Sequence, residues 1–177
     1  MNLEKLYIRN RWFEDLPVGE FHVFGSHTFS EKEVIEFGRK YSPAAHYTDP
    51  EAAFDTAHRG LVVSEWHIAA TWMKLMVGYM ERFATGVQDG RRNGAGVGIQ
   101  DMQWLRPVRP GHTLTYTYEI IEKPERVVRN TWGIIRSRNE AFNQNNERVF
   151  SFEIDILAER NPERVPETLP SDRTANN

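Results

Sequence analysis

A glycine-rich segment divides this 177-residue chain into two parts with different hydrophobic periodicity. Residues 85–96 contain four of the twelve glycines. Before them, residues 61–83 carry apolar side chains at the three- and four-residue spacing of a buried helix. After them come runs that alternate apolar or β-branched residues with polar ones, as strands do: 97–105, 113–122, 130–142 and 148–158. The sequence therefore predicts an α+β domain with one long helix and an antiparallel sheet.

Short polar connections separate consecutive strand-like runs. They are Arg-Pro-Gly-His at 109–112, Lys-Pro-Glu-Arg at 123–126 and Asn-Gln-Asn-Asn at 143–146. Connections of this length and composition suit antiparallel neighbours. We therefore expect each run to pair with the next one along the chain.

The first half contains signals for shorter helices. Residues 31–40 read as a helix whose start is marked by Ser30 and Glu33, the spacing of a capping box. A structured loop should follow over 41–50, because a helix does not continue through proline. Asp49 can then cap a second helix with a proline at its first position, and Ser64 can cap the long helix.

Composition excludes several classes of protein. Cysteine is absent, which rules out disulfides and thiolate nucleophiles. The net charge of -3 gives no overall attraction for nucleic acid or anionic lipid. The chain has no apolar run long enough to span a membrane, and its charged start is unlike a signal peptide, so we expect a cytoplasmic protein. His22 and His27 lack acidic companions at metal-ligand spacing, so we assign no metal.

Several stretches carry a family resemblance. They are FEDLPVGE (13–20), YSPAAHYTDPEAA (41–53), GLVVSEWHIAA (60–70), WLRPVRPGHTL (104–114) and FNQNNERVFSFEIDILAER (142–160). In this order they resemble the MaoC-like dehydratase family, which includes (R)-specific enoyl-CoA hydratases. The resemblance implies a hot-dog fold, in which an antiparallel sheet wraps a long central helix. It also implies a homodimer or a dimer of dimers, with no cofactor. We expect residues 1–160 to form this single domain and 161–177 to be a polar, proline-containing tail.

The resemblance also indicates where the chemistry should lie. The family pattern places an Asp, and five positions later a His, in the segment that corresponds to 41–53; together they activate a water at carbon 3 of an acyl thioester. Aligned without gaps on residues 49–53, these positions fall on Ser42 and Tyr47. A phenol is almost wholly protonated at neutral pH and is a poor general base, and a serine carries no charge. The site is therefore expected to be atypical.

Two neighbouring residues are candidates to replace the pair. His46 is one position from the expected His, and a shifted loop would bring its imidazole into the site; alternatively it only packs the loop. Glu65 lies where family members often have Gly, close to the start of the long helix. There a carboxylate can act as base or nucleophile, or simply stabilise the first turn of the helix.

Further residues are candidates for substrate binding. Gly60 would allow a sharp entry to the helix, where backbone amides can form an oxyanion hole. Ser64 and Trp66 lie beside that entry, although Trp66 also fits a core or dimer contact. Arg106 and Arg109 can meet the phosphates of CoA, or be solvated turn residues.

Three functions stay open. The first is an acyl-thioester (enoyl-CoA) hydratase or dehydratase with an atypical site. The second is a hot-dog acyl-CoA thioesterase that uses Glu65. The third is a non-catalytic protein that binds acyl-CoA or partners an active subunit.

Overall fold

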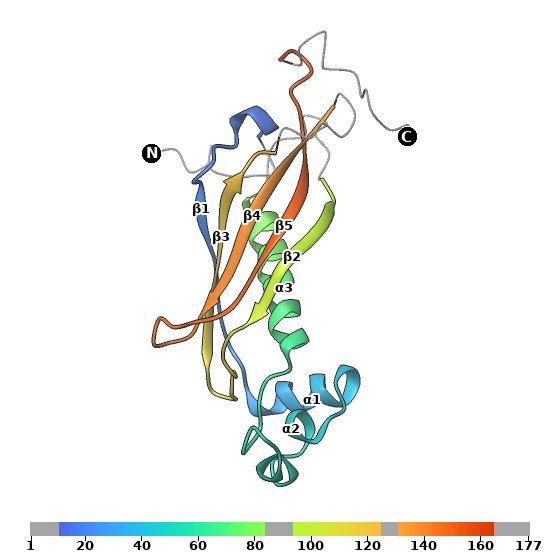
Figure 1. The fold of residues 1–177 in the computed structure, drawn as a ribbon, viewed down its shortest axis with the longest axis vertical. Coiled ribbons are helices and arrows are strands. Elements are labelled where there is room, and N and C mark those ends of the chain that lie inside the picture. Colours follow the sequence, from blue (N-terminus) through green and yellow to red (C-terminus); the bar gives the residue numbers. More distant parts are fainter. Residues whose placement is uncertain (1–10, 84–93, 125–130, 165–177) are drawn as a thin grey trace, which may run out of the picture.

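The computed structural model describes residues 11–83, 94–124 and 131–164 (Figure 1). Its strands are β1 (Phe21–Thr28), β2 (Gly96–Trp104), β3 (Thr113–Glu122), β4 (Trp132–Phe142) and β5 (Arg148–Glu159). Its helices are α1 (Glu31–Tyr41), α2 (Ala45–Thr48) and α3 (Glu65–Phe83), with one-turn 3-10 helices at Phe13–Asp15 and Ala52–Asp55. The expected long helix and the four expected strands are therefore confirmed.

All five strands form one antiparallel sheet in the order β1-β3-β4-β5-β2. The expectation that residues 97–105 pair with 113–122 is wrong, because β2 pairs with β5 at the sheet edge. The segment between β2 and β3 explains this difference. It crosses the end of the sheet, where Val108 O accepts a hydrogen bond from Val63 N (2.8 Å) and Phe29 O accepts one from Gly111 N (2.7 Å). Because of these contacts, β3 begins beside β1 and pairs with it.

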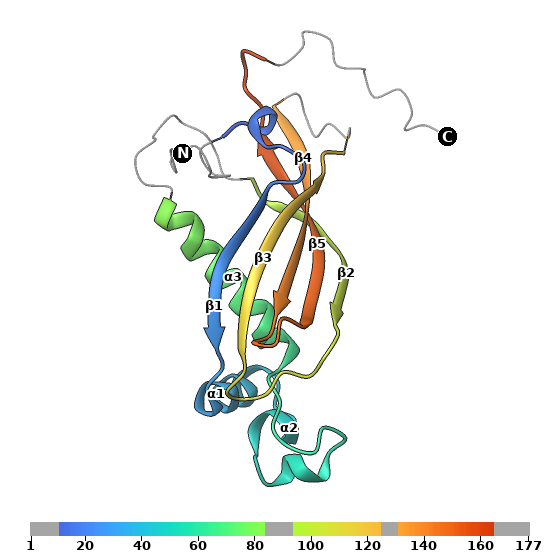
Figure 2. The same cartoon turned by 90° about the vertical axis from the view of Figure 1, so that its left-hand side faces the viewer.

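Helix α3 lies across one face of the sheet and supplies much of its core (Figures 1 and 2). Ile68 and Trp72 are buried, and Trp72 Nε1 donates to Asn139 Oδ1 of β4 at 3.0 Å. The Tyr116 hydroxyl of β3 donates to Ile68 O at 3.1 Å. Each bond satisfies a buried polar group and also fixes the helix to the sheet. Figure 2 shows the C-terminal end of α3 standing farther from the sheet than its N-terminal end.

Helices α1 and α2 lie at the N-terminal end of α3, below the sheet in Figure 1. Ser30 caps α1 as expected, since its hydroxyl accepts from Glu33 N at 3.3 Å. The approach of α1 to α2 leaves no room for a side chain at Gly38. A Cβ there would lie 2.4 Å from Tyr47 O, closer than any normal contact. Glycine at this position therefore sets the distance between the two helices.

The segment 41–50 is more ordered than the loop expected there, because residues 45–48 form α2. Asp49 does cap the next element: its Oδ1 accepts from Glu51 N (2.9 Å) and Ala52 N (3.1 Å). The element is only one 3-10 turn, however, because the chain folds back at once and Gly60 N donates to Ala53 O at 3.0 Å. The expected second helix is thus reduced to a turn.

The C-terminal residues are described as far as Arg164. Asn161 N donates to Glu14 Oε2 at 3.0 Å, and Arg164 bonds Asp15 Oδ1 at 2.8 Å, so β5 is followed by contacts with the first 3-10 turn. The rest of the expected tail, 165–177, lies outside the described residues. Within the described ranges, no helix combines the length and apolarity needed to cross a membrane.

Candidate active site

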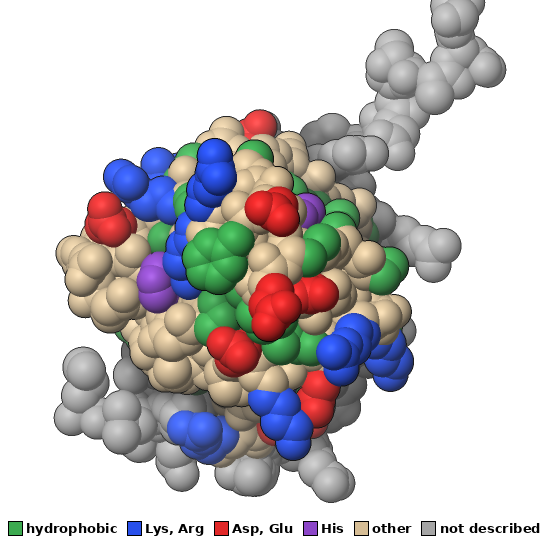
Figure 3. Space-filling model, turned by 90° about the horizontal axis from the view of Figure 1, so that it is seen from below, with side chains coloured by type: hydrophobic (Ala, Val, Ile, Leu, Met, Phe, Trp, Pro, Cys, Tyr) green, Lys and Arg blue, Asp and Glu red, His purple; other side chains and the backbone are tan. Residues whose placement is uncertain are grey.

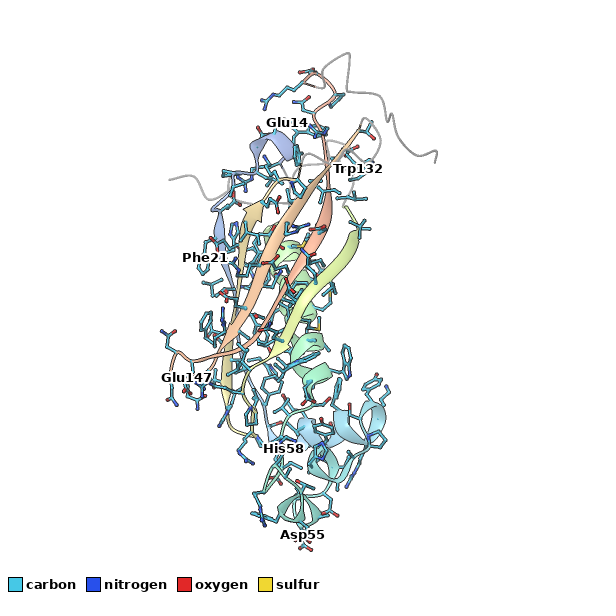
Figure 4. All side chains as sticks on the ribbon, in the orientation of Figure 1. Glu14, Phe21, Asp55, His58, Trp132 and Glu147 are labelled. Carbon is cyan, nitrogen blue, oxygen red and sulfur yellow. The ribbon has the colours of Figure 1, made fainter. Side chains whose placement is uncertain are left out.

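The residues selected from the sequence gather at one end of the molecule, where α1, α2 and the loop before α3 meet the first turn of α3. Figure 4 places His58 and Asp55 at this end, opposite Glu14 and Trp132. Seen from that end, the surface carries both acidic and basic side chains as well as apolar ones, without a large patch of one sign (Figure 3). The charge pattern alone therefore does not select a ligand.

Tyr47 and Glu65 form the shortest link across this end. The Tyr47 hydroxyl donates to Glu65 Oε2 at 2.5 Å, joining α2 to the first turn of α3. Burial raises the pKa of Tyr47, and the bond to the carboxylate raises it further. The phenol therefore stays protonated near neutral pH, and it serves as a donor that orients the carboxylate rather than as a base.

Ser42 and Ser64 form a second link. Their hydroxyls are 2.9 Å apart, and Ser64 is almost completely buried. Ser42 ends α1, and its N–H donates to Gly38 O at 2.8 Å. The two hydroxyls thus connect the end of α1 to the residue just before α3. Each hydroxyl can both donate and accept, so the pair can also hold a water molecule.

The ring of His46 packs against the ring of Tyr47. Its ring centroid is 4.0 Å from that of Tyr47 and 4.9 Å from that of His58. Burial lowers the pKa of His46, and His58 lowers it further, against an opposing effect of Glu65. Its backbone also has a structural role, because His46 O accepts from Val62 N at 2.9 Å. The imidazole is therefore neutral near pH 7.

A cavity of about 190 Å³ opens beside Glu65. Ile68, Trp104 and Arg106 are among the residues that line it. Trp104 Nε1 donates to Glu65 O at 3.1 Å, so the indole holds the backbone that carries the carboxylate. Trp66 is 61% exposed and meets Trp104 edge-on, with ring centroids 5.6 Å apart. The expected core role of Trp66 does not fit this exposure; the dimer-contact alternative and its substrate-binding role stay predictions.

The loop that leads into α3 depends on Gly60 and Arg109. Gly60 has φ of +136°, a conformation that side chains disfavour, as its expected role at a sharp entry requires. Arg109 Nη2 donates to His58 O at 2.6 Å, and Nη1 donates to Leu61 O at 3.2 Å. These bonds occupy much of the guanidinium and brace the loop on both sides of Gly60.

Arg106 is more available than Arg109 to an anionic group. It lies at the cavity beside Glu65 and makes an exposed ion pair with Glu147, 3.6 Å apart. Exposed ion pairs of this length contribute little to stability, so the pair is readily exchanged for another anion. Phosphate binding by either arginine stays a prediction.

Sequence reasoning missed two residues at this site, Trp104 and His58. Trp104 belongs to a stretch that carried the family resemblance, but nothing local indicates that its indole reaches Glu65, 39 positions earlier. His58 precedes the turn at Gly60 and has no motif of its own. Among the described residues, no cluster of three or more His, Asp or Glu side chains is arranged to hold a metal ion.

The comparisons with known proteins agree with this architecture. Residues 26–152 match the model of the FAS1-like, dehydratase domain region family. The uncharacterized protein YdeM of Bacillus subtilis (strain 168) is 24% identical over 147 residues, which cover 83% of this chain and 98% of YdeM. The MaoC-like dehydratase from Rhodospirillum rubrum is 25% identical, with a TM-score of 0.73, over 86% of this chain and 99% of that one. The R-hydratase PhaJ1 from Pseudomonas aeruginosa, 19% identical, shares the fold at a TM-score of 0.63 over 85% and 86%.

Proposed function

Because the chain belongs to the FAS1-like dehydratase domain family and has the MaoC-like hot-dog fold, we propose that it is an acyl-thioester hydratase or dehydratase. In this proposal Glu65, positioned by Tyr47, performs the acid–base chemistry at an atypical site. The observation that carries it is the 2.5 Å hydrogen bond, which holds a carboxylate at the start of α3 and beside a cavity. The substrate is an acyl-CoA or another acyl thioester.

The first turn of α3 is suited to hold the thioester. Glu65 and Trp66 contribute its first amides, which have no acceptor within the helix and point along its axis. A thioester carbonyl placed against them gains stabilisation as negative charge develops on its oxygen. Gly60, Ser64 and Trp66 border this place, and Arg106 lies where it can meet the phosphates of CoA.

Hydration then needs one proton to move twice. Glu65 takes a proton from water while the water oxygen bonds to carbon 3, and the electron pair of the double bond moves toward the thioester oxygen. The carboxyl group returns the proton to carbon 2 as the carbonyl re-forms. Dehydration is the reverse sequence. Tyr47 keeps its proton throughout and fixes the carboxylate, and the Ser42–Ser64 pair holds the water.

Replacement of Glu65 by Gln tests this proposal. The amide oxygen can still accept from Tyr47, but it cannot take a proton from water. We expect the hydration of crotonyl-CoA, followed by loss of the enoyl absorbance, to slow by at least about 100-fold. Glu51→Gln, an exposed carboxylate near the same loop, is the matched control and should leave the rate unchanged. Equal rates for wild type and Glu65→Gln would contradict the proposal.

Hydrolysis is the second candidate, and the same carboxylate favours it. A water activated by Glu65 can attack the thioester carbonyl carbon instead of carbon 3, which releases a free thiol. Thiol release with saturated butyryl-CoA, lost in Glu65→Gln, would select hydrolysis. Binding of both esters with no turnover would instead select a non-catalytic acyl-CoA-binding protein or partner subunit.

We also propose that the working unit is a homodimer or a dimer of dimers. β2 is an edge strand whose Val97 and Ile99 are more than half exposed, and Trp66 is exposed nearby. A long edge strand with apolar side chains invites pairing with another chain. A two-fold pairing of β2 with its copy would cover these groups.

A further inference from the structure

Helices α1 and α2 stand outside the sheet, at the N-terminal end of α3 (Figures 1 and 2). They pack on each other closely, because Gly38 of α1 lies against Tyr47 O of α2. Two side-chain bonds join them to α3 and the residue before it: that of Ser42 to Ser64 and that of Tyr47 to Glu65. The candidate active site is therefore complete only while α1 and α2 are docked on the start of α3.

His67 lies at the contact between α1 and α3. Its ring stacks on Phe37 of α1, with the two planes parallel and the centroids 4.3 Å apart. It also meets Phe29, the residue after β1, edge-on at 5.1 Å between centroids. Phe29 is fully buried. The imidazole therefore fills the space through which α1 packs on α3.

One atom of this ring, Nδ1, is buried and has no hydrogen-bond partner among the described residues. A neutral imidazole tolerates this, because the tautomer with its proton on Nε2 leaves only an acceptor at Nδ1. Protonation of His67 would instead place an N–H donor and a positive charge at this buried position. Both are costly to bury without a partner. The docked arrangement therefore favours the neutral ring.

Charged groups face His67 from the three elements packed around it. Glu33 of α1 favours the protonated ring, but its carboxylate already bonds His27 Nε2 of β1 at 2.5 Å. His27 and Lys74 of α3 oppose protonation. Burial is the largest effect, and the pKa of His67 is lowered to about 4. The ring is thus neutral in the docked state at pH values where a histidine in water is largely protonated.

We propose that His67 makes the docking of α1 and α2 depend on pH, so that acid releases residues 31–48 from α3 while the sheet stays folded. Release exposes the imidazole to water, where it can bind a proton without cost. Proteins do open in contiguous units of this kind. Release also breaks the bonds of Ser42 and Tyr47, so acid would disassemble the candidate site. That last effect rests on the proposed function, whereas the release itself does not.

Hydrogen exchange of the full chain, followed by mass spectrometry at pH 7 and pH 5, tests the proposal without any substrate. After correction for intrinsic exchange rates, the opening constant of residues 31–48 should rise roughly 10- to 30-fold at pH 5, since the released histidine has its ordinary pKa near 6.5. It should also exceed the opening constant of β4 at both pH values, because the sheet does not open with α1 and α2.

Two substitutions identify the group responsible. His67→Phe keeps a ring to stack on Phe37 but does not titrate, so the rise at pH 5 should disappear. His67→Gln, which also does not titrate, gives the same test if circular dichroism shows that the phenylalanine variant is misfolded. His27→Gln is the matched control: it removes a neighbouring histidine, its amide can still donate to Glu33, and most of the rise should remain.

Three results would overturn the proposal. The first is an opening constant of residues 31–48 that is the same at pH 7 and pH 5. The second is a rise that persists in the His67 variants or is lost in His27→Gln instead. The third is equal opening of residues 31–48 and β4 at pH 5, which would mean that the chain opens only as a whole. A hydration rate that is unchanged in Glu65→Gln would refute the proposed function and leave this result standing.

Discussion

The hydroxyl of Tyr47 on α2 donates a 2.5 Å hydrogen bond to Glu65 Oε2 in the first turn of α3. The bond thereby joins two elements that are separate in the sequence. The donor cannot easily lose its proton, because burial and the carboxylate raise the pKa of Tyr47. Under the proposed function the two residues therefore have different roles: Glu65 moves protons and Tyr47 positions it.

Tyr47→Phe separates positioning from proton transfer. The ring is retained, but the carboxylate loses its donor. Hydrogen bonds to charged groups contribute about 1.5–3 kcal/mol, so we expect kcat to fall roughly 10- to 100-fold with little change in KM. Steady-state kinetics with an enoyl-CoA measure this. A loss as large as that in Glu65→Gln, or a change confined to KM, would contradict a positioning role.

His46→Gln tests the rival base. The structure uses the backbone oxygen of His46 to hold Val62, and that bond survives the substitution. If Glu65 is the base, the hydration rate should change by less than about threefold, well below the 100-fold or greater loss that follows removal of a general base. A loss of that size in His46→Gln would move the base from Glu65 to His46.

Arg109→Ala should destabilise the protein by about 2 kcal/mol. The substitution removes two charge-assisted bonds to His58 O and Leu61 O, which brace the loop around Gly60. Arg106→Ala is the control, since its exposed ion pair with Glu147 should contribute less than about 0.5 kcal/mol. Urea unfolding measures both. Equal stability of the two variants would show that Arg109 does not brace the loop.

His67 should make stability depend on pH. It stacks on Phe37 at 4.3 Å between centroids, and burial lowers its folded pKa to about 4, with Glu33 opposing this and His27 and Lys74 adding to it. In the unfolded chain the pKa is near 6.5. Between these values the unfolded chain binds more protons, so stability falls as the pH falls from about 6.5 to 4.

Replacing His67 by Phe should flatten this dependence, because phenylalanine keeps the stacking but does not titrate. Urea midpoints measured at pH 7, 5.5 and 4.5 for both proteins give the comparison. Parallel curves for wild type and His67→Phe would exclude His67 as the source.

Ile99→Lys tests the proposed dimer. The lysine would place a charge on the exposed face of edge strand β2, and we expect sedimentation to shift toward the monomer. Phe21→Lys is the matched control: Phe21 is also 56% exposed, but lies on β1 at the opposite edge of the sheet. A monomeric wild type at micromolar concentration would contradict the proposal directly.

The sequence predicted the fold well because its signals are local. The capping box at Ser30 and the periodicity of residues 65–83 each specify an element from its own side chains. Strand neighbours are not specified in this way. The connection at 109–112 has the composition of a turn, yet the bond of Gly111 to Phe29, and that of the preceding Val108 to Val63, hold the chain across the end of the sheet.

The candidate site was predictable as a set of residues but not as a geometry. Ser42, Tyr47 and Glu65 were each selected from the sequence, whereas the bonds Tyr47–Glu65 and Ser42–Ser64 depend on how α1, α2 and α3 meet. Arg109 illustrates the limit, since a guanidinium suited to phosphate is equally suited to carbonyl oxygens. Its partners are 48 and 51 positions away, which no local pattern reveals.

Gly38 has a consequence for how this chain can vary. In the interior of an exposed helix, Gly→Ala is ordinarily an improvement of about 1 kcal/mol, and a library of variants would favour it. At Gly38 the same methyl group would press on Tyr47 O and push α2 away from α1. A saturation library should therefore show this position to be intolerant even of alanine. Gly38 lowers the helix propensity of α1, but its lack of a side chain allows α2 to lie close to α1.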